Sequence, residues 1–204
     1  LPSKPMKPAS DVFKWKDCIA KSKPNPPKAK LTFDDVAMYQ YTGGTTGVSK
    51  GVILTHGNIS KQVQQISSWF PKFHGSYNIN LGALPFFHVF GMSCAMNFSV
   101  YQAWGDLLIP KPQPEPLLDA IRKFKPNFGA LVPTMFIGML NHPNMKNTDM
   151  TCFKGFFSGC APLPVEVIHD FEKTAGSVIC EGFGMTETTP VTHTNPFEGV
   201  RKIG

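Results

Sequence analysis

The sequence predicts an α/β fold in which a mostly parallel sheet is flanked by helices. Two observations support this prediction: short apolar runs alternate with segments of helical spacing, and proline or glycine separates many of them. Alternating strands and helices are typical of parallel sheets covered by helices. Because ligands bind such sheets beyond the carboxyl ends of the strands, we expect functional residues in the loops that follow the strands.

The first predicted elements surround a Gly/Thr-rich loop. The apolar run 36–41 predicts a strand that enters this loop. Asn58 is a predicted N-cap, and apolar residues recur at helical spacing from there to about Phe70. A short buried strand is expected at 79–84, and the apolar segment 88–104 predicts a buried helix.

The remaining elements continue the alternation of strand and helix. Pro116 and Pro126 bound one short amphipathic helix, and Pro133 suits the first turn of the next. The predicted elements, in order, are strand 106–109, helix 117–124, strand 128–132, helix 133–140, strand 153–157, helix 165–174 and strand 178–180.

Composition limits the classes of protein. The 204 residues carry a formal net charge of +6, and much of the excess lies in a Pro/Lys-rich lead at 1–30. This lead has little arginine and no aromatic ladder, so we expect a solvated connector rather than a nucleic-acid-binding arm. The chain starts at Leu1 and stops without a tail, so we expect a piece of a longer protein.

Cysteine usage and hydropathy exclude further classes. The five cysteines show no C-x-x-C pair, which argues for reduced thiols in a cytoplasmic protein and against a zinc site or a disulfide framework. The longest apolar stretch, Val89–Trp104, is too short and too polar for a membrane span.

The loop after the first predicted strand is the most informative segment. Glycine exposes backbone N–H groups, threonine adds hydroxyl groups and lysine adds a charge, which together suit a polyphosphate. It is not a Walker A sequence, because Ser49 precedes Lys50 and Gly51 follows it. A flexible surface turn is the alternative. The candidate phosphate-binding residues are Thr42, Gly43, Gly44, Thr45, Thr46, Gly47 and Lys50.

Three further segments follow predicted strands. His88 lies among aromatic residues and could border an apolar pocket, although a lone histidine in such surroundings is more often part of the core. The small-residue turn 158–164 precedes a helix. In the segment 181–190, Thr186 and Glu187 supply a hydroxyl and a carboxylate, which suit Mg²⁺ held against a triphosphate.

These four segments resemble, in the same order, the motifs of the AMP-forming adenylating enzymes. That superfamily comprises acyl-CoA synthetases, luciferases and peptide-synthetase adenylation domains. The spacing of the His88 segment is most similar to that of long-chain fatty acyl-CoA synthetases. The resemblance implies that 31–204 is part of the large N-terminal AMP-binding domain of such an enzyme, without its C-terminal lid domain.

The resemblance also implies roles for single residues. His88 would orient the carboxylate of the acid, Lys50 and Thr186 would contact phosphates, and Thr42 and Glu187 would lie at the metal. Phe183 stands where the family usually has tyrosine, so it would stack on the purine without a phenolic hydrogen bond. The residues implied at the bound nucleotide, mainly around its adenine, are Gly159, Cys160, Ala161, Glu181, Gly182, Phe183 and Gly184.

The implied reaction joins a fatty acid to CoA at the expense of ATP, through an acyl-adenylate, with Mg²⁺ as cofactor. The acidic ribose motif, the Gly-Arg-x-Lys hinge and the C-terminal catalytic lysine of the family are not found in this sequence. The fragment itself is therefore expected to be nearly inactive. An aryl-CoA ligase, a luciferase-like enzyme and a non-catalytic nucleotide-binding module are the alternatives. Peripheral membrane association and a homodimer stay open.

Overall fold

The computed structural model describes residues 13–25, 28–42, 47 and 49–203. The chain divides into two compact units, residues 1–31 and residues 32–204. In the first unit, the helix α1 (Trp15–Lys21) has no buried residue, so it contributes no core of its own. The second unit holds the sheet and every segment that the sequence links to a functional site.

The second unit alternates strands and helices as predicted. Its regular elements are β1 (Val36–Thr42), β2 (Lys50–Thr55), α2 (His56–Trp69), β3 (Ile79–Gly82), the π-helix η2 (Gly91–Asn97), α3 (Phe98–Tyr101), β4 (Gly105–Leu108), α4 (Pro114–Phe124), β5 (Phe128–Leu131), α5 (Pro133–Leu140), β6 (Gly155–Ser158), α6 (Val165–Ala175), β7 (Ile179–Gly184) and β8 (Val191–Thr194). Short 3₁₀ turns lie at η1 (Pro71–Phe73), η3 (Pro143–Asn147) and η4 (Thr186–Thr188).

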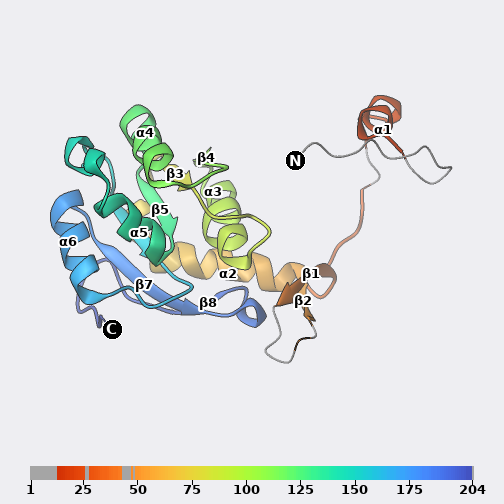
Figure 1. The fold of residues 1–204 in the computed structure, drawn as a ribbon. Coiled ribbons are helices and arrows are strands. Elements are labelled where there is room, and N and C mark those ends of the chain that lie inside the picture. The colour runs from red at the N-terminus through yellow and green to blue at the C-terminus, as the bar shows by residue number, and fades with distance from the viewer. Residues whose placement is uncertain (1–12, 26–27, 43–46, 48, 204) are drawn as a thin grey trace. The chain divides into compact units, whose positions relative to one another are not determined.

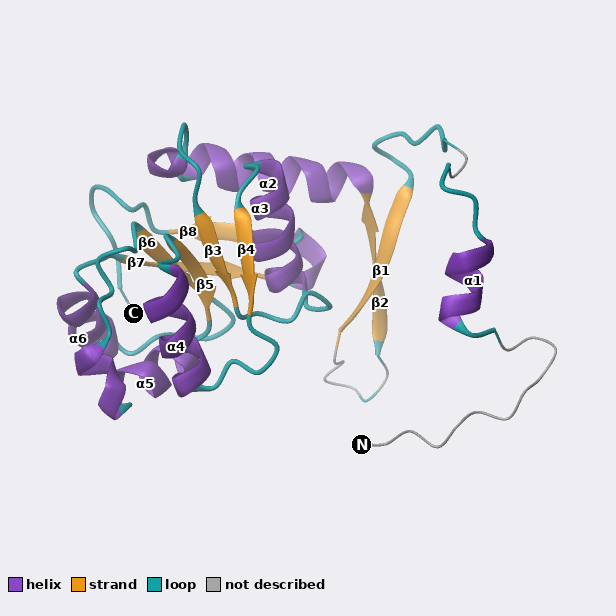
Figure 2. Cartoon of the chain, turned by 90° about the horizontal axis from the view of Figure 1, so that it is seen from above, coloured by secondary structure: helices purple, strands orange, loops and turns teal. Residues whose placement is uncertain are grey.

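The main sheet has six strands in the order β4-β3-β5-β6-β7-β8. The first five strands are parallel, and β8 pairs antiparallel with β7. The prediction of a mostly parallel sheet is therefore confirmed. Helices α4, α5 and α6 cover one face, and α2 and α3 cover the other (Figure 1). The view from above shows the same layers, with the hairpin β1–β2 beside the main sheet (Figure 2).

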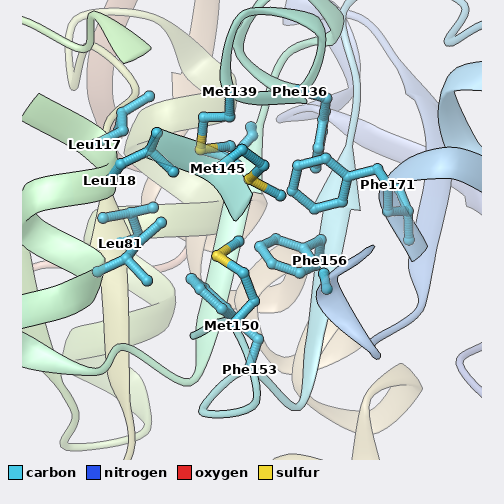
Figure 3. Close-up of a cluster of buried hydrophobic side chains, with 14 of the residues drawn as sticks. Leu81, Leu117, Leu118, Phe136, Met139, Met145, Met150, Phe153, Phe156 and Phe171 are labelled. Carbon is cyan, nitrogen blue, oxygen red and sulfur yellow. The ribbon is translucent and has the colours of Figure 1, made fainter. Parts of the chain in front are cut away.

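Neighbouring residues of one strand belong to two hydrophobic cores, one on each face of the sheet. Phe156 and Phe157 follow each other in β6 and point to opposite faces, as strand geometry requires. Phe156 packs beneath α5 and α6, where its ring centroid lies 5.3 Å from that of Phe171 (Figure 3). Phe157 belongs to the core on the α2 side, 5.5 Å from the ring of Phe70. The sheet is thus buried on both faces, as parallel sheets usually are.

The start of α2 differs from the prediction. The N-cap is Thr55, and Asn58 occupies the third helical position instead. The Thr55 hydroxyl accepts from the Asn58 backbone N–H at 3.1 Å, and the Asn58 side chain accepts from the Thr55 N–H at 2.9 Å. This reciprocal capping box satisfies two backbone donors where a single cap would satisfy one, and the N-cap lies three residues before the predicted Asn58.

Other differences concern short elements. The predicted helix 88–104 is confirmed as a continuous helical segment at 89–101, but its middle is the π-helix η2 and its last part is α3. Helix α4 begins three residues before the predicted 117 because proline fits a first turn. Strands β2 and β8 were not predicted. Within the described ranges, no helix is long and apolar enough to cross a membrane.

Candidate active site

The candidate segments meet at the carboxyl ends of the strands. The His88 turn follows β3, the 159–164 turn follows β6, and the 184–190 turn follows β7. Strands β6 and β7 are neighbours in the sheet, which places their two turns side by side. The hairpin that carries Lys50 reaches the same region, since β2 contacts the turn η4.

Two adjacent pockets occupy this region. The smaller, about 210 Å³, is lined by His88, Val89, Phe90, Phe157, Gly159, Cys160, Gly182, Phe183, Gly184, Met185, Thr186, Pro190 and Val191. The larger, about 520 Å³, is lined by Cys160, Ala161, Pro162, Glu181, Gly182, Phe183, Gly184, His193, Thr194, Asn195 and Lys202. Cys160 and residues 182–184 border both pockets, so two ligand moieties bound there would be neighbours.

Most of the predicted site residues therefore lie together. The structure brings His88, the 159–161 turn, residues 181–184 and Thr186 to the two pockets. Thr42, Gly47, Lys50 and Glu187 do not line either pocket. The predicted phosphate-loop residues Gly43, Gly44, Thr45 and Thr46 lie outside the described residues.

Two glycines let the chain pass closely between the pockets. A Cβ on Gly182 would overlap the Phe157 ring, with Cζ at 2.6 Å and Cε2 closer still, and one on Gly184 would lie 2.7 Å from the carbonyl carbon of Pro190. Real Cβ atoms essentially never come within 3.0 Å of such neighbours. Glycine is required at both positions because the adjacent groups, a core ring and a backbone carbonyl, have no room to withdraw.

Glu181 connects the two neighbouring turns. Its carboxylate accepts a hydrogen bond from the Leu163 N–H at 3.0 Å, which fixes the end of the 159–163 turn. Its backbone carbonyl accepts from the Asn195 N–H at 2.9 Å and from the Thr194 hydroxyl at 3.2 Å. The carboxylate thus holds the wall of the larger pocket in place while it borders that pocket.

The His88 ring has a defined orientation. Its Nδ1 accepts a hydrogen bond from the Phe90 N–H at 3.2 Å, so in the neutral ring the proton lies on Nε2. Gln40 in β1 donates to the carbonyl oxygen of Phe87 at 2.9 Å. The strand that enters the phosphate loop is therefore tied directly to the turn that carries His88.

The donors at Glu187 suit a metal that is shared with a ligand. Glu187 is exposed, and the described ranges contain no group of three His, Cys, Asp or Glu residues able to hold a metal ion by themselves. Mg²⁺ usually takes one or two carboxylates and completes its shell with substrate phosphates and water. Glu187 and the Thr186 hydroxyl, beside β2, fit a magnesium ion that arrives with a polyphosphate.

Cys160 borders both pockets, but its chemistry is not that of a nucleophile. Its thiol pKa is raised by burial, so the neutral form prevails at neutral pH. The residue has a φ of +73°, a left-handed conformation that residues other than glycine seldom adopt. Cys160 is therefore a residue of the pocket wall rather than a reacting group.

Sequence reasoning missed part of the larger pocket. His193, Thr194, Asn195 and Lys202 line it, and the first two belong to β8. The Asn195 amide also holds Lys202, because it donates to the Lys202 carbonyl at 2.8 Å and accepts from its N–H at 3.1 Å. The sequence feature that could have revealed these residues is the short run after Pro190, but it is too brief and too polar to predict a strand.

Comparisons with known proteins agree with this geometry. Residues 3–204 match the family described as AMP-binding enzyme. A long-chain-fatty-acid–CoA ligase of Bacillus subtilis is 42% identical over 170 residues, which cover 83% of this chain and 30% of that protein. A probable 4-coumarate–CoA ligase 1 of Dictyostelium discoideum is 33% identical over 173 residues, or 83% of this chain and 31% of that protein.

A solved structure supports the fold. ATP-bound MatB from Rhodopseudomonas palustris superposes with a TM-score of 0.83 at 29% identity, covering 93% of this chain and 37% of that one. The chain spans about a third of the length of the curated relatives it matches. On the family match over nearly its whole length, and on the 42% identity to the Bacillus subtilis ligase, this chain belongs to the AMP-binding enzyme family.

Proposed function

We propose that this chain is the nucleotide- and acid-binding part of an AMP-forming ligase that activates a fatty acid with ATP and transfers the acyl group to CoA. The observation that carries the proposal is the pair of pockets that share residues 182–184. The larger has backbone and carboxylate groups suited to a purine, and the smaller joins His88 to apolar residues suited to an acid. A carboxylate bound in one would lie beside the phosphates of a nucleotide bound in the other.

The first half-reaction needs positioning more than proton transfer. The carboxylate of the acid is already anionic, so it can attack the α-phosphorus of ATP without a general base and release pyrophosphate. The Nε2–H of His88 is available to orient that carboxylate, because Nδ1 is occupied by the Phe90 N–H. Lys50 would lie at the phosphates and lower their repulsion of the incoming anion. Mg²⁺, when bound with ATP, would neutralise phosphate charge near Thr42, Thr186 and Glu187.

Similarity to fatty-acid ligases favours a fatty acid as the substrate. The 42% identity to the Bacillus subtilis long-chain-fatty-acid–CoA ligase exceeds the 33% identity to the Dictyostelium discoideum coumarate–CoA ligase. Phe90 in the smaller pocket is apolar and offers no polar partner for a phenolic hydroxyl. An aromatic acid is the second candidate, because 4-coumarate–CoA ligases are among the relatives.

Residues 31–204 would be one part of the AMP-binding domain, with the lead 1–30 as a connector. We propose that the chain alone does not complete the reaction, since it corresponds to about a third of the ligases it resembles. CoA would enter for the second half-reaction, in which its thiol displaces AMP. ATP–pyrophosphate exchange by the isolated chain, at a rate close to that of the complete protein, would contradict this division.

Acid-dependent ATP–pyrophosphate exchange by the complete protein tests the function. We expect exchange with fatty acids and much less with aromatic acids assayed in parallel. Glu187→Ala should slow exchange at least about tenfold, roughly 1.4 kcal/mol of barrier. Glu166→Ala, which removes an exposed carboxylate from the first turn of α6, is the matched control and should leave the rate unchanged. Absence of exchange with every acid would refute the proposal.

A further inference from the structure

Two buried polar side chains from distant elements hold the turn that carries Thr186 and Glu187. Ser93 of η2 is fully buried, and its hydroxyl donates to the Thr189 carbonyl at 2.8 Å. Gln62 of α2 is 5% exposed, and the carbonyl oxygens of Thr188 and Val191 face its amide. Only the NH₂ group can satisfy two carbonyls, so it donates to them at 2.9 and 3.1 Å.

The turn needs such support because its backbone is strained. Thr189 has a φ of +73°, in the left-handed region that threonine rarely occupies. Its carbonyl is the one that Ser93 holds. Within the turn, the Thr188 hydroxyl accepts from the Met185 N–H at 3.1 Å, and its single proton lies within reach of two carbonyls, those of Met185 and Pro190. A conformation of this kind persists only where surrounding groups determine it.

The same helix reaches back to the phosphate-loop hairpin. Thr55, the last residue of β2, is the N-cap of α2, and Gln62 lies about two turns further along. The hairpin strand β2 also contacts η4. The chain therefore runs without a break from Lys50 through β2 and α2 to Gln62, whose amide faces the carbonyl of Thr188 next to Glu187.

We propose that Gln62 and Ser93 are positioning residues that hold Thr186 and Glu187 at the place where metal-bound polyphosphate is gripped. The proposal rests on the function proposed above. It places the two residues behind the reacting groups, with no contact to a ligand. The consequence is selective: they matter for a ligand that carries a metal and a polyphosphate, and much less for AMP, which has neither the β- and γ-phosphates nor the shared metal.

The test compares binding of MgATP and of AMP to the complete protein by isothermal titration calorimetry. Gln62→Met keeps the length of the side chain and removes both hydrogen bonds, and Ser93→Ala removes one. We expect each variant to bind MgATP at least about fivefold more weakly, with AMP affinity changed less than twofold. With EDTA present to remove the metal, the affinity of each variant for ATP should differ little from that of the wild type.

Matched controls separate positioning from general damage. Ser99→Ala removes a buried hydroxyl that has no hydrogen-bond partner among the described residues, and Gln102→Met removes an amide that bonds Ser67 at 2.7 Å instead of the turn. Both should bind MgATP like the wild type. If Gln62→Met does not fold, Ser93→Ala decides. Equal weakening for AMP and MgATP, or none for either, would overturn the positioning role, whereas wild-type protein that binds no MgATP would overturn the function itself.

Discussion

Replacing Gly182 with alanine tests whether the strand between the pockets is fitted against the core. The new Cβ would lie 2.6 Å from Cζ of Phe157, although ordinary contacts begin at 3.4 Å. Phe157 is 1% exposed and its ring centroid lies 5.5 Å from those of Phe70 and Phe90, so it has no space to withdraw. Overpacking of this kind costs about 1–3 kcal/mol, or about 2–4 °C in Tm for each kcal/mol.

A double-mutant cycle identifies the cause. Phe157→Leu shortens the ring that the new methyl group would meet, at its own cost of a large-to-small change in the core. If the overlap is responsible, the double variant should lose less stability than the two single variants together, by about 1 kcal/mol or more. Differential scanning calorimetry of the complete protein measures all four Tm values. Additive losses would show that the Gly182 effect does not come from contact with Phe157.

Three further predictions concern thiols and charges. At alkaline pH, which forms the thiolate of the exposed Cys160, iodoacetamide should modify Cys160 faster than Cys180, whose pKa burial raises to about 12. ATP should slow the modification of Cys160, and mass spectrometry of the peptides checks both outcomes. Arg201→Met should lower the free energy of unfolding by about 2 kcal/mol, because it leaves the half-buried Glu172 carboxylate without its cationic partner at 3.1 Å. Calorimetry should show this as a lower Tm, and an unchanged Tm would contradict the prediction. Burial raises the pKa of Asp106 above 3.8, so the native state binds a proton more tightly than the unfolded chain, and stability falls as pH rises from 3.8 through the native pKa. Asp106→Asn should therefore raise Tm at pH 7 and lose that advantage below pH 3.8. A lower Tm of the variant at pH 7 would contradict the prediction.

The sequence was sufficient where local chemistry decides the structure. Helix α5 has the predicted bounds 133–140 because Pro133 fixes its first turn and apolar residues fill the rest. The parallel sheet followed from the alternation of elements. In contrast, β8 exists because β7 offers it an antiparallel edge, and its four residues carry no pattern of their own. The same holds for β2, which is a strand through its antiparallel pairing with β1.

The site was predictable for residues that lie in motifs, and not for those that support them. His88, Glu181 and Phe183 could be named from short segments that follow strands. Gln62 and Ser93 could not, because each is an ordinary polar residue in a helix until tertiary structure places it against a carbonyl more than ninety residues away. The capping error at Asn58 has the same origin at shorter range, since two reciprocal hydrogen bonds outcompeted one.

The alternation of Phe156 and Phe157 in β6 makes the floor of the smaller pocket a part of the core. Phe157 lines that pocket and also packs against Phe70, so a change that enlarged the floor would remove packing beneath α2. The rim is different, because Phe183 and Met185 are exposed and contribute little to the packing of the core. Substitutions that adapt the pocket to bulkier or differently shaped ligands should therefore cost less stability at the rim, where side-chain size can change without loss of core packing.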